Sequence, residues 1–166
     1  MPVFENILQD VAWLPNGEQF IVISGNQPST STLYDKNCKP LFEFGKRYRN
    51  TVRICPFSQL ALIGGFGNLK GNFDLWRLDT LEDVGSAKSD CAITIDWSPD
   101  GQNIMTAVLY ERVKVDNQIN LFSGCGNKEV KGGHQFKQLD YAAWQPSPPG
   151  TYKKPDIDTM RQASEG

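Results

Sequence analysis

Three short segments of this chain carry cations in settings that suit a phosphate-rich partner. The first, residues 45–50, reads Gly-Lys-Arg-Tyr-Arg-Asn, so that Lys46, Arg47 and Arg49 surround one tyrosine. Cations interleaved with an aromatic side chain can hold RNA by charge and by base stacking. The same composition also occurs in solvated connecting loops, so both interpretations stay open from these six residues.

The second segment is a glycine-rich loop at residues 64–71, Gly-Gly-Phe-Gly-Asn-Leu-Lys-Gly. Its glycines permit positive φ angles and close backbone approach, and Lys70 could meet an anion. A dinucleotide-type phosphate loop needs a third glycine at the fingerprint spacing and a following helix, and both are missing. We therefore interpret the segment as a shaped connection between two strands.

The third segment, residues 109–117, reads Leu-Tyr-Glu-Arg-Val-Lys-Val-Asp-Asn. Arg112 and Lys114 alternate with valines, so an extended backbone would project both cations to one side. Such a basic stripe suits phosphate groups or a protein partner, whereas a solvated loop face is the alternative.

A sequence repeat defines the strands and turns between which these three cationic segments lie. A bulky apolar residue stands two positions before a proline at four places, and the prolines at 15, 56, 99 and 146 are separated by 41, 43 and 47 residues. Proline cannot donate to a β-ladder and presets a turn, so each phrase marks the end of a buried strand. A period in the low forties is that of four-stranded propeller blades.

The predicted fold class is therefore all-β, a WD-repeat-like β-propeller of about three four-stranded blades plus the first strand of a fourth. Residues 1–147 hold the blades, and 148–166 are expected to form a disordered tail. The expected bounds are 9–45, 50–88 and 93–131 for the blades and 138–145 for the first strand of the next blade. Because a propeller closes with more blades than this, the remaining blades of the same propeller are expected as partners.

Charge and cysteine usage exclude several classes of function. The formal net charge of −2 gives no general attraction to nucleic acid, so any RNA contact depends on local patches. The four cysteines form no C-x-x-C pair and the chain has one histidine, which argues against a zinc site and favours buried thiols in a reducing compartment. We find no signal region, no membrane span and no catalytic constellation, so we expect a cytoplasmic protein that is not an enzyme and has no cofactor, no metal and no membrane partner.

Six phrases follow one another in a fixed order along the chain. They are Gly-Phe-Gly-Asn-Leu-Lys-Gly at 65–71, Leu-Trp at 75–76, Asp-Trp-Ser-Pro-Asp-Gly at 96–101, Thr-Ala at 106–107, Arg-Val-Lys-Val-Asp-Asn at 112–117 and Ala-Trp-Gln-Pro at 143–146. In this order they resemble the propeller of the eukaryotic translation initiation factor 2A family, over residues 9 to 147. The resemblance implies that this chain corresponds to the C-terminal third of a large propeller.

The resemblance also implies a function: a noncatalytic translation initiation factor whose propeller is a platform. Its implied partners are the small ribosomal subunit, the initiator methionyl-tRNA that it helps to deliver, and other initiation factors. The alternatives are the b subunit of translation initiation factor 3, or another WD-repeat scaffold for complex assembly. The candidate RNA-binding or partner-binding residues are Lys46, Arg47, Arg49, Lys70, Arg112 and Lys114.

Overall fold

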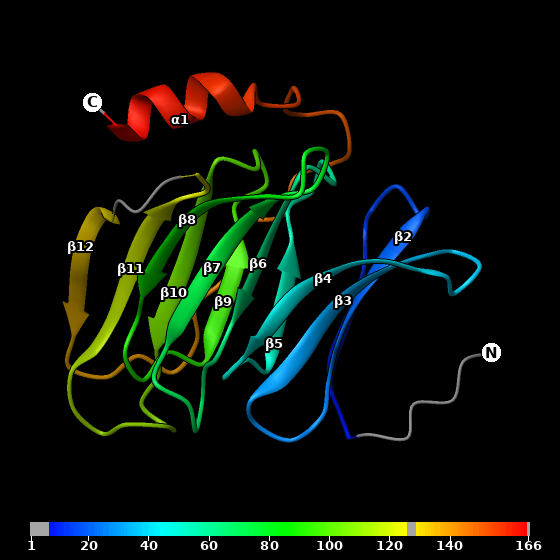
Figure 1. The fold of residues 1–166 in the computed structure, drawn as a ribbon. Helices are drawn as coiled ribbons and strands as arrows, with labels where there is room; N and C mark the ends of the chain where they lie inside the picture. Colours follow the sequence, from blue (N-terminus) through cyan, green and yellow to red (C-terminus); the bar gives the residue numbers. More distant parts are fainter. Residues whose placement is uncertain (1–6, 126–128, 166) are drawn as a thin grey trace.

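The computed structural model describes residues 7–125 and 129–165, which form three four-stranded antiparallel sheets and one helix (Figure 1). Each sheet takes four consecutive strands in chain order, so each is one blade. Blade 1 holds β1 (Leu8–Trp13), β2 (Gln19–Ser24), β3 (Ser29–Asp35) and β4 (Pro40–Arg47). Blade 2 holds β5 (Thr51–Ile54), β6 (Leu60–Gly64), β7 (Asn72–Arg77) and β8 (Glu82–Lys88). Blade 3 holds β9 (Thr94–Trp97), β10 (Asn103–Val108), β11 (Asn117–Ser123) and β12 (Glu129–Phe136).

The proline phrases form the same turn in all three blades. In the first and third, Gly17 and Gly101 adopt φ angles of +74° and +72°, which glycine accepts without strain. In the second blade Ser58 takes this place with φ 59°. The backbone N–H of Ser58 donates to Cys55 O at 3.1 Å, as the N–H of Gly17 does to Leu14 O at 2.9 Å. Blade 2 therefore makes the same turn although serine stands in place of glycine.

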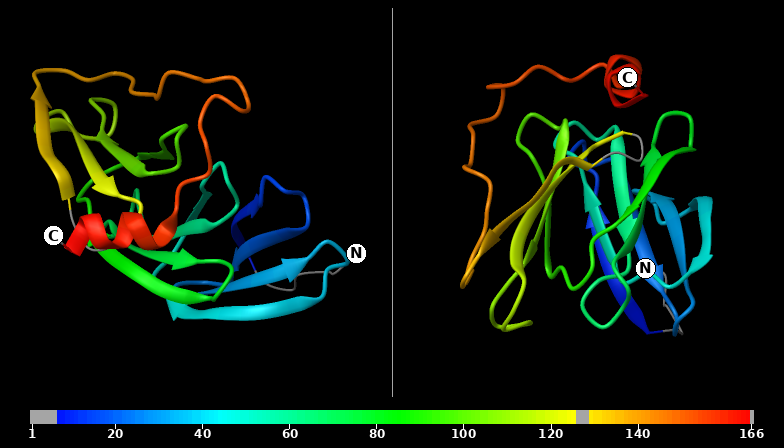
Figure 2. Two further views of the ribbon diagram at one scale, coloured as in Figure 1. Left: turned by 90° about the horizontal axis from the view of Figure 1, so that it is seen from above. Right: turned by 90° about the vertical axis from the view of Figure 1, so that its left-hand side faces the viewer.

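Apolar side chains from neighbouring blades fill the two spaces between the sheets. One cluster joins blades 1 and 2, and the other joins blades 2 and 3. Strand β6 is buried along its whole length because blade 2 is covered on both faces, which explains its unbroken apolar sequence. Seen from the end that α1 covers, the three sheets follow one another like neighbouring blades (Figure 2). The predicted propeller-like architecture is therefore confirmed.

One hydrogen bond recurs between successive segments that carry the proline phrases. The indole Nε1–H of Trp97 donates to Arg53 O at 3.0 Å, and that of Trp144 donates to Asp96 O at 3.3 Å. Both tryptophans stand two residues before their proline, and both acceptors stand three residues before theirs. The segment that carries Trp144 therefore docks beside β9 in the way that β9 docks beside β5.

Two expected features of the C-terminal part differ in the structure. Residues 138–145 form no strand, because an inner strand is held by the second strand of its own blade and the described residues that follow turn instead into a helix. Strand β12 continues to Phe136, beyond the expected end of blade 3 at 131.

The tail predicted as disordered over 148–166 contains helix α1 (Ile157–Glu165). Asp156 caps the helix, since its carboxylate accepts from the Asp158 backbone N–H at 3.0 Å and from the Thr159 hydroxyl at 3.1 Å. Ile157 and Met160, one turn apart, are buried in the cluster of blades 2 and 3. The prediction failed because tertiary burial of only two apolar side chains holds this otherwise polar helix.

Candidate nucleic-acid interface

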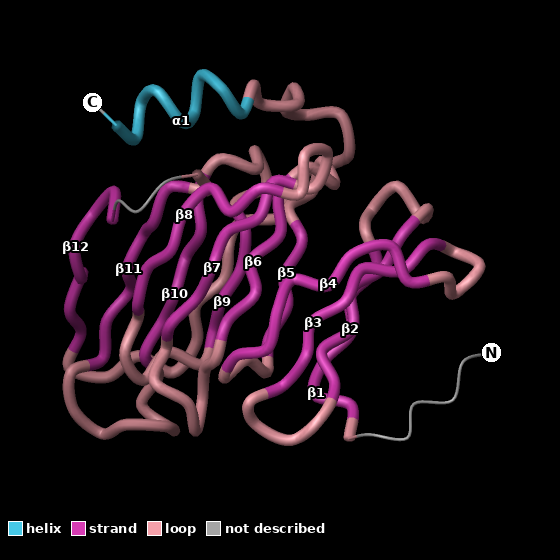
Figure 3. Tube along the Cα trace, in the orientation of Figure 1, coloured by secondary structure: helices cyan, strands magenta, loops and turns pink. Residues whose placement is uncertain are grey.

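The loops of the molecule gather at two opposite ends of the strands (Figure 3). The proline turns lie at the end that α1 crosses, which we call the covered end. The connections 25–28, 48–50, 65–71, 89–93 and 109–116 lie at the other end, which we call the open end (Figure 1). All three cationic segments predicted from the sequence reach the open end.

A groove of about 1120 Å³ lies between β4 of blade 1 and strands β7 and β8 of blade 2, next to the glycine loop. Its lining includes one carboxylate, Asp74, and five cations, namely Lys46, Arg47, Arg49, Lys70 and Lys88. We call this hollow the basic groove. It has the opposite sign of charge to the chain as a whole, whose formal net charge is −2.

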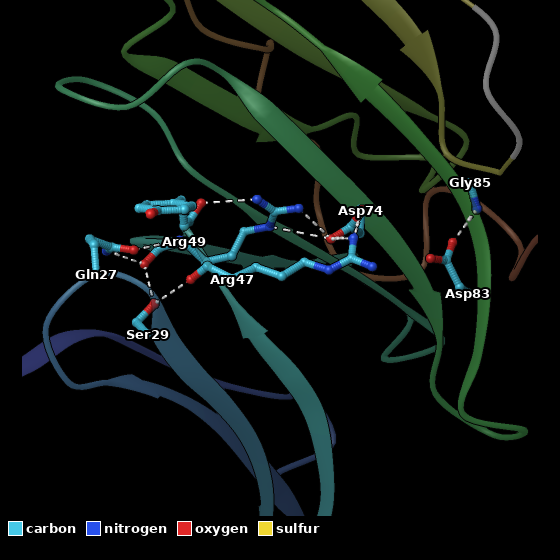
Figure 4. A network of polar contacts seen from close by, with 8 residues as sticks. Gln27, Ser29, Arg47, Arg49, Asp74, Asp83 and Gly85 are labelled. Carbon is cyan, nitrogen blue, oxygen red and sulfur yellow. Dashed lines mark hydrogen bonds and ion pairs between the residues drawn. The ribbon is translucent and has the colours of Figure 1, made fainter.

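Asp74 neutralises part of this charge in an asymmetric network (Figure 4). Its carboxylate accepts from Arg49 Nη2 at 2.6 Å and from Arg49 Nε at 3.2 Å, while Arg47 Nη1 lies 3.3 Å from both oxygens. Arg49 is only 7% exposed, whereas the Arg47 side chain is 60% exposed. Arg49, predicted as a direct binding residue, is instead buried, and its guanidinium donates to Asp74 and to Tyr48 O. Arg47 faces the groove.

The backbone on either side of Tyr48 is held in place. The Arg49 N–H donates to Gln27 Oε1 at 2.9 Å, and the Arg49 carbonyl accepts from Gln27 Nε2 and from the Ser29 hydroxyl, each at 2.6 Å. Arg49 Nη1 donates to Tyr48 O at 2.9 Å. A Cβ at Gly65 would clash with the same oxygen, so only glycine allows this approach. Tyr48 is 61% exposed, and it is one of the residues that line the basic groove.

The glycine loop is a shaped connection from β6 to β7, as we interpreted it. Five of its backbone N–H groups already donate to protein oxygens, namely those of Gly65, Phe66, Gly67, Leu69 and Gly71. They are therefore not free to cradle a phosphate. Gly71 adopts φ +87°, and a Cβ there would clash with Ser89 O. The loop thus supplies shape, and its exposed Lys70 supplies charge.

The connection 109–116 does not form the extended basic stripe that its alternation predicted. The backbone N–H groups of Arg112 and Val113 both donate to Leu109 O, at 3.1 and 3.0 Å, so the chain turns here. Arg112 Nη2 donates to Gly67 O at 2.8 Å, and Lys114 Nζ lies 4.2 Å above the centre of the Tyr110 ring. The alternation of cations and valines did not predict this arrangement, because the chain turns here and the two cations contact different partners.

The structure thus brings Lys46, Arg47 and Lys70 to one groove, with Arg49 beneath them, and leaves Arg112 and Lys114 outside its lining. Sequence reasoning missed Lys88, whose ammonium lies 2.9 Å from the exposed carboxylate of Asp90. Only strand register could have revealed this residue, because Lys88 on β8 pairs with Asn72, the residue that follows the glycine loop.

Other kinds of site find little support in the described part of the chain. Among residues 7–125 and 129–165, no group of three His, Cys, Asp or Glu side chains could hold a metal ion. None of the four cysteines, all of which lie in the described ranges, takes part in a disulfide; Cys55 and Cys125 are buried as expected, but Cys91 is exposed and Cys38 half-buried. No helix in these two ranges has the length and apolar character needed to cross a membrane.

Residues 3–137 match the family model described as Eukaryotic translation initiation factor eIF2A. The chain belongs to this family. It is 36% identical over 162 residues to Eukaryotic translation initiation factor 2A of Dictyostelium discoideum, a match that covers 95% of this chain and 26% of that protein. The eIF2A-family segment described here therefore spans about a quarter of that relative's length.

Two further similarities place the segment among its relatives. The B subunit of Eukaryotic translation initiation factor 3 from Xenopus laevis is 26% identical over 157 residues, covering 91% of this chain and 22% of that protein. A solved structure titled "Crystal structure of the eukaryotic initiation factor" superposes with a TM-score of 0.82 and 27% identity, over 88% of this chain and 37% of that chain. The resemblance to the factor 2A family is confirmed, and the similarity to the factor 3 protein is weaker.

Proposed function

We propose that this eIF2A-family segment is a noncatalytic platform of the translation initiation machinery that contacts RNA through the basic groove. The groove is the observation that supports the proposal most directly. Lys46, Arg47 and Lys70 converge there on one hollow whose lining carboxylate, Asp74, is already paired. Cations in such an arrangement hold the phosphate backbone and make binding sensitive to salt.

The RNA partners that we propose are the small ribosomal subunit and the initiator methionyl-tRNA, with other initiation factors close by in the cytoplasm. Support comes from the family, whose name is that of a translation initiation factor. These partners belong to the whole protein, of which this segment would supply one contact surface.

A second candidate is a scaffold for protein contacts at the far face of blade 1. Leu8, Val11 and Trp13 on β1 are about half exposed, which leaves an apolar strip at the edge of the sheets. An apolar strip of this kind fits another blade of the same propeller or a protein partner. The two candidates use different surfaces, so one set of variants separates them.

The test uses the protein at its full natural length and measures binding to small ribosomal subunits and to initiator tRNA over a range of salt. Lys46→Glu with Lys70→Glu should weaken binding strongly. It should also lower the slope of log affinity against log salt by roughly 0.7 to 0.9 for each phosphate that the protein no longer neutralises.

The matched control is Lys39→Glu with Lys153→Glu, which changes net charge equally at two exposed sites outside the groove. The control should bind nearly as the wild type does. Equal losses in both variants, or an unchanged affinity in the groove variant, would contradict the proposal.

A further inference from the structure

The geometry points to an unpaired, single-stranded stretch of RNA as the occupant of the basic groove, with one base stacked on Tyr48. This inference rests on the proposed RNA contact and specifies the form of RNA that is bound. Tyr48 is 61% exposed beside several cations, an arrangement that suits a planar ligand carrying negative charge.

The backbone that carries Tyr48 is held by hydrogen bonds and by a close approach of Gly65. The Arg49 side chain and the close approach of Gly65 fix the Tyr48 carbonyl, and Gln27 and Ser29 fix the next peptide. The backbone is thus ordered before any ligand arrives, so binding loses less conformational entropy. Arg49 is accordingly a positioning residue, which acts through Tyr48.

The charges around Tyr48 fit a strand whose phosphates pass on both sides of a stacked base. Lys46 and Arg47 lie on β4, while Lys70 and Lys88 lie on the blade 2 side of the groove. Arg47 can turn toward a phosphate without leaving Asp74 unpaired, because Arg49 holds that carboxylate at the shorter distance of 2.6 Å. Arg47 is thus available to contact the ligand, whereas Arg49 stabilises the protein around Asp74.

The remaining lining also fits an unpaired nucleotide. Pro28, Leu69 and Ala87 offer apolar surface to a base or sugar, and Asn68 and Asn72 offer amide groups to base edges. In duplex RNA the base faces are covered by their neighbours, so stacking on a side chain and reading by amides require unpaired bases. A duplex would use the cations and leave Tyr48 without a partner.

The experiment measures fluorescence anisotropy of a short uridine oligomer and of an RNA duplex with the protein at its full natural length. Tyr48→Ala should weaken binding of the oligomer by about tenfold while the salt slope stays unchanged. Tyr48→Phe, which keeps the ring, should bind as the wild type does. Tyr152→Ala removes another exposed tyrosine, outside the groove, and should have no effect.

Three outcomes would overturn the inference while RNA binding by the wild type persists. They are an unchanged affinity of Tyr48→Ala for the oligomer, an equal loss for the duplex, or tighter binding of polyglutamate than of the oligomer. If the wild type bound neither the oligomer nor the duplex, the proposed function itself would be contradicted. The urea midpoint of Tyr48→Ala should match that of the wild type, which separates a loss of stacking from a loss of folding.

Discussion

The two ends of the same three sheets differ in how far they follow the repeat. At the covered end each blade makes the same proline turn, and the chain closes this end with α1, whose Ile157 and Met160 enter the core. At the open end the connections differ in length and composition, and they leave a cationic hollow. The covered end receives the apolar side chains of α1, whereas the open end presents the basic groove. Surfaces for partners are therefore expected where the repeat is interrupted.

The largest effect is expected from a test of the separate roles of Arg47 and Arg49 at the open end, in which each arginine is removed in turn. Arg49→Ala should lower the free energy of unfolding by roughly 3–5 kcal/mol, because the buried Asp74 carboxylate loses its main partner. Urea denaturation measures this change. Arg47→Ala is the matched control and should cost less than about 1 kcal/mol, since this side chain is mostly exposed. Similar losses from the two variants would show that the network is shared evenly and would remove the basis for separate roles.

A smaller effect is expected where α1 closes the covered end. Met160→Ala should lower the free energy of unfolding by about 2 kcal/mol, because it empties a buried position between α1 and blades 2 and 3. Urea denaturation measures this change too. RNA affinity should stay at the wild-type level, since the groove lies at the other end.

The control for α1 is Gln162→Ala on the exposed side of the helix, which should change stability by less than about 0.5 kcal/mol. If Met160→Ala also weakened RNA binding, the two ends would be coupled and the comparison would fail.

The smallest effect concerns an ion pair at the covered end. Arg77 donates to the Asp79 carboxylate at 2.7 Å and to Asp158 of α1 at 3.0 Å. The hydrogen bond from Arg77 lowers the pKa of Asp79. A carboxyl with a lowered pKa in the folded state contributes stability above its unfolded pKa and loses that contribution as the pH falls through the folded pKa.

Acid titration of stability should therefore separate the wild type from Asp79→Asn. Between about pH 5 and pH 2 the wild type should lose a few tenths of a kcal/mol more than the variant, because the exposed pair is screened by water. Parallel curves would show that this pair adds nothing to the stability of the covered end.

The blades could be predicted from the sequence because their signals are local. Proline turns and apolar strands recur with a period in the forties, and each needs only its neighbours in the chain. No groove was predicted, but three of the residues that line it, Lys46, Arg47 and Lys70, were predicted as candidates, since cations near turns tend to be exposed.

Most of the features that the sequence did not predict depend on residues that are distant in the chain. Arg49 looks like a surface cation until Asp74, 25 residues later, is known to lie beside it. Helix α1 has too few apolar side chains to be recognised, and its stability comes from the apolar surface that blades 2 and 3 offer to it. The turn at 109–116 and the position of Lys88 follow from hydrogen bonds and register that composition does not reveal.

The recurring tryptophan hydrogen bond has a direction along the chain. Trp97 and Trp144 donate backward, to carbonyls of the preceding inner strand. A ribosome releases the N-terminal residues first, so each acceptor is already in place when its donor emerges. The blades can therefore be added one after another while the chain is still being synthesised, each newcomer docking on the blade before it.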